Sequence, residues 1–208
     1  MDDAAGLGEI PTTTLADILG RDQAMAISIR PLWPPVRRVA GPAFTVTCPP
    51  GDNLMLHAAI YRAAPGSVLV VESGDVDYAV AGGNVCAVAQ RRGVAALVVD
   101  GVIRDLAAVR DSGFPVFARG VVPVAGAKAV AAPLNAPVRC GGVTVRAGDI
   151  VVADEDGVMV IPADRQEQVL RDARARLARE ADQTLDAWEA EHRARIGTIL
   201  AESGFDGG

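Results

Sequence analysis

The chain has few aromatic residues, no basic run and no long apolar run, and each absence argues against a class of protein. Aromatic residues make up 4% of the sequence, and the formal net charge is −6. Surfaces that bind nucleic acid concentrate positive charge, so a nucleic-acid partner is not expected. No apolar run could span a bilayer, and the acidic N-terminus lacks a basic region followed by an apolar core. We therefore expect a cytoplasmic protein that binds neither nucleic acid nor a membrane.

Cysteine is scarce as well. Cys48, Cys86 and Cys140 are widely separated and form no CxxC pair. This spacing is typical of small buried apolar residues in a reducing cytosol, and not of disulfides or metal ligands.

What the sequence does contain is typical of one soluble α/β domain. Half of the 208 residues are apolar, mostly Ala and Val, and a chain of this length can bury a substantial core. Apolar and β-branched runs predict strands at 39–48, 67–72, 95–99, 114–118, 150–154 and 157–161, and a hairpin at 138–149. Caps and helical periodicity predict helices at 14–19, 54–63, 84–92 and 106–112.

A long amphipathic helix is expected to begin near Asp164 and to run toward Glu202. Its apolar positions step by three and four residues, and its other faces are dense in Arg and Glu. After a domain of this size, such a helix has little core left to cover. We therefore divide the chain into a catalytic domain, 1–163, and a C-terminal helix, 164–208, that packs on a neighbouring subunit.

An adjacent arginine and aspartate follow the most apolar strand. The run Leu97–Val99 is followed by Asp100 and Gly101, which predict that the strand ends there in a turn. Arg104 and Asp105 then stand side by side. A guanidinium can bind an oxyacid in two places, and a carboxylate is a hard oxygen ligand for a divalent cation. The pair suits a small oxyacid bound to magnesium; the alternative is a surface salt bridge.

A double glycine, Gly82 and Gly83, precedes one of the predicted helices. Bare backbone N–H groups at a helix start can bind an anion, although close packing of helix on strand explains such glycines equally well. In open α/β sheets, ligands bind beyond the carboxyl ends of the strands, where the double glycine and the Arg-Asp pair both lie. His57, a lone histidine in a helix, is interpreted as a packed or solvated residue.

Taken together and in order, seven motifs resemble the RraA-like family over roughly residues 12–165. The motifs are Gly51–Leu54, Val68–Val71, Gly82–Asn84, Val99–Asp105, Gly141–Val143, Gly148–Asp149 and Ala153–Val158. That family includes the class II 4-hydroxy-4-methyl-2-oxoglutarate aldolases, which also decarboxylate oxaloacetate. Older labels call its members dimethylmenaquinone methyltransferase-like.

The resemblance implies an α/β protein with the RraA-like β/β/α swivelling-domain fold. It also implies homotrimers or hexamers with an active site between subunits, and a divalent cation, Mg²⁺ or another such as Mn²⁺. By position, Arg104 would hold the oxygens of the 2-oxo acid and Asp105 the metal. Backbone amides would bind the substrate carboxylate at positions Gly82, Gly83, Asn84 and Val85.

The resemblance further implies a catalytic glutamate from the C-terminal helix of the neighbouring subunit. Glu180 is the first candidate at this position, with Glu189 and Glu191 behind it. The aldolases of the family carry an aspartate twenty-one positions before the arginine of the pair, where it helps to hold a catalytic water. Gly83 stands there in this chain.

The expected activity is that of a divalent-metal-dependent lyase acting on 2-oxo acids, as an aldolase, a decarboxylase or both, through a pyruvate enolate. The alternative is a non-enzymatic regulator that binds a ribonuclease, but the regulators of the family typically lack the aspartate of the pair, which this chain keeps as Asp105. A methyltransferase ranks last, because no glycine fingerprint with a following acidic ribose ligand is present. Asp75, Asp77 and Glu180 all remain open as the general base.

Overall fold

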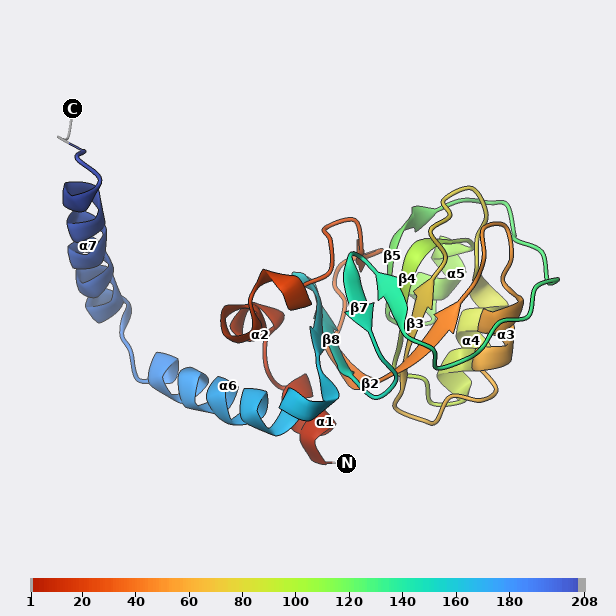
Figure 1. Ribbon diagram of the computed structural model, residues 1–208, viewed down its shortest axis with the longest axis horizontal. Coiled ribbons are helices and arrows are strands. Elements are labelled where there is room, and N and C mark those ends of the chain that lie inside the picture. Colours follow the sequence, from red (N-terminus) through yellow and green to blue (C-terminus); the bar gives the residue numbers. More distant parts are fainter. Residues whose placement is uncertain (1, 206–208) are drawn as a thin grey trace. The chain divides into compact units, whose positions relative to one another are not determined.

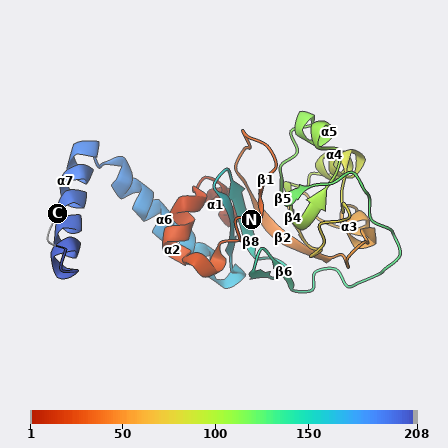
Figure 2. The same ribbon diagram turned by 90° about the horizontal axis from the view of Figure 1, so that it is seen from above.

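The computed structural model describes residues 2–205 and divides into two units, Met1–Ala173 and Arg174–Gly208 (Figures 1 and 2). The first unit contains a seven-stranded sheet in the order β1-β5-β4-β3-β2-β8-β9, and a separate two-stranded hairpin, β6-β7. The strands are β1 (Arg30–Pro31), β2 (Val39–Thr47), β3 (Val68–Glu72), β4 (Ala96–Ile103), β5 (Val116–Val121), β6 (Val138–Cys140), β7 (Val143–Val145), β8 (Ile150–Asp154) and β9 (Gly157–Ile161).

The helices are α1 (Asp2–Gly8), α2 (Thr12–Leu19), α3 (Leu54–Ala59), α4 (Gly83–Arg91), α5 (Leu106–Asp111), α6 (Gln166–Ala181) and α7 (Leu185–Glu202). Within the sheet, β2, β3, β4 and β5 are parallel neighbours, whereas β8 and β9 continue it in antiparallel pairing. The carboxyl ends of the four parallel strands therefore meet at one edge of the sheet. The mixed α/β fold is confirmed, and so are the hairpin and the presence of all the predicted strands, although β4 ends later than predicted.

Alternating side chains of the central strands build a core on each face of the sheet. Leu69 and Val71 of β3 belong to the core that α3, α4 and α5 cover, and these three helices lie together in both views (Figures 1 and 2). Val68 and Val70 point the other way, into the core beneath the β6-β7 hairpin and β8. Because both faces are covered, β3 reads in the sequence as a continuous apolar run.

The prediction that the strand at 95–99, which is β4, ends in a turn at Asp100-Gly101 was wrong. β4 continues to Ile103, and its register with β5 shifts between Val99 and Val102. Asp100 can stay inside the sheet because its buried carboxylate forms an ion pair with Arg119 and accepts the Gly141 N–H. The glycine thus marks a bulge and not a turn.

The C-terminal helical segment is confirmed, but it consists of two helices and not of one. α6 ends at Ala181, and α7 begins at Leu185 with the Thr184 hydroxyl accepting the Ala187 N–H at 3.2 Å. A threonine at this position caps a new helix, which the periodic apolar pattern alone does not reveal. None of the helices found in residues 2–205 is long and apolar enough to cross a membrane.

Candidate active site

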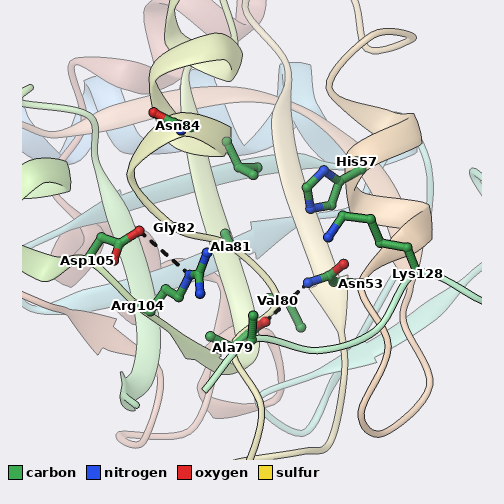
Figure 3. A pocket seen from close by; sticks show the side chains of 12 residues that line it. Asn53, His57, Ala79, Val80, Ala81, Gly82, Asn84, Arg104, Asp105 and Lys128 are labelled. Atoms are coloured by element: carbon green, nitrogen blue, oxygen red, sulfur yellow. Dashed lines mark hydrogen bonds and ion pairs between the residues drawn. The ribbon is translucent and has the colours of Figure 1, made fainter. Parts of the chain in front are cut away.

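A small cavity of about 80 Å³ lies at the carboxyl edge of the parallel strands (Figure 3). It is far smaller than the roughly 300–1,000 Å³ of pockets that take drug-sized ligands, so it suits a small molecule. Its walls come from the end of β4, the start of α4, helix α3 and two connecting segments. The lining residues are Asn53, His57, Ala79, Val80, Ala81, Gly82, Asn84, Val85, Arg104, Asp105, Ala125 and Lys128.

Arg104 and Asp105 form one wall of the cavity. The Arg104 N–H donates to the Ala81 carbonyl at 2.9 Å, which fixes the backbone just beyond β4. The Arg104 Nε lies 3.7 Å from the Asp105 Oδ2, and both side chains are about half exposed. Asp105 is left-handed (φ 60°), a conformation that costs a non-glycine residue energy and is concentrated at functional sites. The pair is thus a wall of the cavity, and more than a salt bridge on an open surface.

The two glycines have different jobs. The Gly83 N–H donates to the Asp105 Oδ2 at 3.0 Å. A Cβ on Gly82 would lie 2.6 Å from the same oxygen and 2.9 Å from the Arg104 Cγ, so a larger residue there would displace the side chains of the pair. Close packing, one of the two interpretations of the double glycine, therefore holds at Gly82. The N–H groups of Asn84 and Val85 lie in the first turn of α4, where a helix offers them no backbone acceptor.

Asp105 could hold a divalent cation through its second oxygen. Within residues 2–205, its Oδ1 has no hydrogen-bond donor, because Gly83 and Arg104 both use Oδ2. No group of three or more His, Cys, Asp or Glu that could enclose a metal occurs among these residues. Mg²⁺ commonly keeps several waters and takes only one or two carboxylates together with substrate oxygens. One half-exposed carboxylate beside an open cavity fits that coordination habit.

The opposite wall consists of Asn53, His57 and Lys128, whose side chains point toward one another in Figure 3. Burial lowers the pKa of His57, and the nearby charge of Lys128 lowers it further, so the imidazole is neutral at pH 7. The sequence prediction missed Asn53 and Lys128 and treated His57 as a packed or solvated residue. One available signal was that Lys128 is the single lysine of a chain with 19 arginines.

The other candidate residues, Asp75, Asp77 and the cysteines, do not line the cavity. The buried carboxylate of Asp75 accepts N–H bonds from Gly51 and Asp77 at 2.7 and 2.8 Å, and neither aspartate lines the cavity. The three cysteines are free and buried. Burial raises the pKa of Cys48 to about 11 and that of Cys86 to about 12, so both thiols stay protonated.

The three glutamates that the resemblance nominated lie in the second unit. Glu180 pairs with Arg176 (2.7 Å) and Glu189 with Arg193 (2.9 Å), while Glu191 accepts a hydrogen bond from Gln183. Arg176 and Arg193 lie on these two C-terminal helices, and Gln183 lies in the short segment between them. A role of any of them in the site of a neighbouring subunit stays a prediction.

The fold and the cavity together define a class: an α/β protein with an oxyacid-sized pocket at the carboxyl edge of its parallel strands. The family model RraA-like, described as Aldolase/RraA, matches residues 12–160. The chain therefore belongs to the RraA-like family.

Relatives support this assignment. A protein of Halalkalibacterium halodurans, provisionally named a 4-hydroxy-4-methyl-2-oxoglutarate aldolase, is 40% identical over 92% of this chain and 88% of its own. A crystal structure from Pseudomonas syringae pv. tomato matches with a TM-score of 0.78 at 28% identity, covering 94% of this chain and 93% of that one. The RNA-processing inhibitor RraA from Thermus thermophilus matches with a TM-score of 0.67 at 29% identity, covering 74% and 93%.

The electrostatic link between Lys128 and His57 predicts a measurable change. In Lys128→Met the pKa of His57 should rise, because the nearby positive charge that disfavours the imidazolium is gone. Burial remains, so the pKa should stay below its ordinary value. An NMR titration of both histidines measures this, with His192 as the internal reference and Lys128→Arg as the charge-preserving control. An unchanged His57 titration in Lys128→Met would show that the two side chains are not coupled.

Proposed function

We propose that this protein is a divalent-metal-dependent lyase that cleaves the carbon–carbon bond next to a 2-oxo acid group. The observation that carries the proposal is a convergence on one small cavity. A guanidinium, a carboxylate with a free oxygen and the unpaired N–H groups of a helix start all border it. These are the groups needed to bind a 2-oxo acid and to stabilise negative charge as it develops.

Each of these residues binds a different part of the substrate. The N–H groups of Asn84 and Val85 bind the carboxylate next to the 2-oxo group, at the positive end of α4. The Arg104 guanidinium donates to the 2-oxo oxygen, where charge builds up as the bond breaks. Asp105 would hold the cation, Mg²⁺ or Mn²⁺, which supplies a Lewis acid for the same oxygen when it is bound.

Both reactions that the family resemblance implies pass through a pyruvate enolate, so one site can serve both. Retro-aldol cleavage of a 4-hydroxy-2-oxo acid also needs a base for the hydroxyl proton, whereas decarboxylation of oxaloacetate does not. Asp105 is the only carboxylate lining the cavity in the described part of the chain, and Gly83 stands where the aldolases carry an aspartate. We therefore propose that decarboxylation is the stronger activity unless Glu180 of a neighbouring subunit, in a homotrimer or hexamer, supplies the base.

The provisional aldolase name of the Halalkalibacterium halodurans relative supports the lyase. The likeness to the Thermus thermophilus RNA-processing inhibitor favours a second candidate, a non-enzymatic regulator that binds a ribonuclease. A regulator has no need of a carboxylate that keeps one oxygen free beside an arginine. Turnover that requires a metal separates the two candidates.

Removal of either member of the pair should abolish activity. In Arg104→Ala and Asp105→Ala, kcat/KM for pyruvate release from oxaloacetate should fall by about 100-fold or more, because each removes charge stabilisation of the enolate. The assay is run with Mg²⁺ and again after chelation with EDTA. Arg110→Ala and Asp111→Ala are the matched controls, since these residues form an exposed pair of the same type at 3.2 Å outside the cavity. Parent-like turnover by Arg104→Ala and Asp105→Ala, or full activity in EDTA, would refute the lyase.

Gly83 offers a gain-of-function test. A Cβ there would meet the Ala108 Cβ at 3.2 Å, a contact that a small shift can relieve, and aspartate is favourable in the first turn of a helix. Gly83→Asp should raise the rate of retro-aldol cleavage by about tenfold or more relative to decarboxylation, because it supplies a group that can hold the proton-accepting water. Gly83→Ala, which adds the Cβ without the carboxylate, is the control. Equal effects of both variants on the two reactions would contradict this role.

A further inference from the structure

Helix α7 has no buried side chain in the part of the chain that the structure describes. Leu185, Trp188 and Ile199 have exposed fractions of 76%, 46% and 51%. A helix of 18 residues is only marginally stable by itself in water, and most helices in proteins are held by the packing of an apolar face. We therefore expect α7 to pack against a further surface. The sequence predicts that a neighbouring subunit provides it, but not which part of that subunit.

The large apolar and aromatic side chains of α7 lie on one face. At about 100° per residue, they fall within roughly a third of the helix circumference. The set is Leu185, Trp188, His192, Ile196, Ile199 and Leu200. The rings of Trp188 and His192 stack with their centroids 4.6 Å apart, in the middle of this face. The opposite face carries small side chains, among them Ala190 and Ala194. α7 thus presents one continuous face that suits packing on another helix.

The order of residues along this face is symmetric about His192. Trp188 and Ile196 lie four positions before and after it, and both are apolar. Leu185 and Ile199 lie seven positions before and after it. If two copies of α7 lie antiparallel with their His192 residues opposite each other, Trp188 therefore meets Ile196 of the partner subunit, and Leu185 meets Ile199 of the partner subunit. Every large side chain of the central face then has an apolar or aromatic neighbour.

The charges on the two flanks of the face fit the same antiparallel alignment. On one flank, Glu189 comes beside Arg193 of the partner subunit, and on the other, Glu191 comes beside Arg195 of the partner subunit. Within each pair the two positions differ in height by about 3 Å along the helix. Glu189 and Arg193 also pair within one helix, but both side chains stay more than half exposed and so are open to a second contact. Opposite charges that flank an apolar face set the orientation of paired helices.

From this pattern we infer that α7 binds the α7 of a second copy of this chain, as an antiparallel pair with its twofold axis at His192. The inference is independent of the proposed function. A twofold pair joins chains two at a time, so a trimer cannot pair all three of its α7 helices within itself. Of the two assemblies that the family resemblance implies, the pairing therefore favours the hexamer. It also engages Glu189 and Glu191, which leaves Glu180 as the glutamate available to a neighbouring site.

Cysteine cross-linking in the intact protein tests the pairing. In His192→Cys the two thiols would face each other across the axis, so mild oxidation should link most chains into disulfide dimers. Ala194→Cys, on the opposite face of α7, is the matched control and should give less dimer by about tenfold or more. The three native cysteines are buried, so they should not react.

A second cysteine position tests the direction of the helices. An antiparallel pair holds the two Leu185 positions about 21 Å apart, whereas a parallel pair would place them opposite each other. Leu185→Cys alone should therefore form no disulfide dimer. Leu185→Cys and Ile199→Cys chains produced together should form a mixed dimer, because these positions meet in the antiparallel pair.

Charge reversal in the His192→Cys background tests the flanks. Glu189→Arg with Glu191→Arg, or Arg193→Glu with Arg195→Glu, places like charges opposite each other, so each double change should lower cross-linking by about tenfold or more. When the two kinds of chain are produced together, cross-linking should return as a mixed dimer. Glu167→Arg with Asp172→Arg, the same change of charge on exposed positions of α6, is the control and should leave cross-linking as it is.

Equal cross-linking of His192→Cys and Ala194→Cys, or none in either, would mean that another surface covers α7, such as the first unit of the chain, and would overturn the inference. Dimers of Leu185→Cys with itself would overturn the antiparallel direction. A failure of the two charge variants to restore cross-linking when they are produced together would contradict the assigned pairs of Glu189 and Glu191.

Discussion

The candidate site depends on how one carboxylate is held. Asp105 follows β4 in a left-handed conformation, and this turns its Oδ2 toward the Gly83 N–H and the Arg104 Nε. The contact joins the end of β4 to the start of α4, and a side chain on Gly82 would push the Asp105 Oδ2 out of this position. Within residues 2–205, Oδ1 accepts no hydrogen bond and is left for a ligand of the cavity that Asp105 lines. The sheet, the double glycine and the left-handed residue together fix the Asp105 carboxylate beside the Arg104 guanidinium.

The cavity has two ends with different origins. One end comes from the α/β unit formed by α4, β4 and the residues just after it, where ligands of open parallel sheets bind. The other end comes from α3 and from the segment 125–128. Backbone hydrogen bonds connect this segment to residues 51–53 and 79.

The first end could be predicted from the sequence, and the second could not. The apolar runs of β3 and β4, the double glycine and the Arg104-Asp105 pair are formed by residues close together in the chain. Such patterns can be recognised in a single sequence. The wall of Asn53, His57 and Lys128 depends on contacts between residues as far as 78 positions apart, such as that of Asp52 with Val130, and these leave no periodic pattern. The same reason explains why β4 was expected to stop early: the partners that let Asp100 stay in the sheet, Arg119 and Gly141, lie 19 and 41 positions further along the chain.

The most direct test of the central claim is a crystal structure of the protein soaked with Mn²⁺ and pyruvate, with anomalous scattering used to locate the metal. The account predicts a manganese peak bonded to the Asp105 carboxylate, with pyruvate beside it and within hydrogen-bond distance of the Arg104 guanidinium. An anomalous peak elsewhere, or pyruvate bound away from Arg104 and the start of α4, would contradict it.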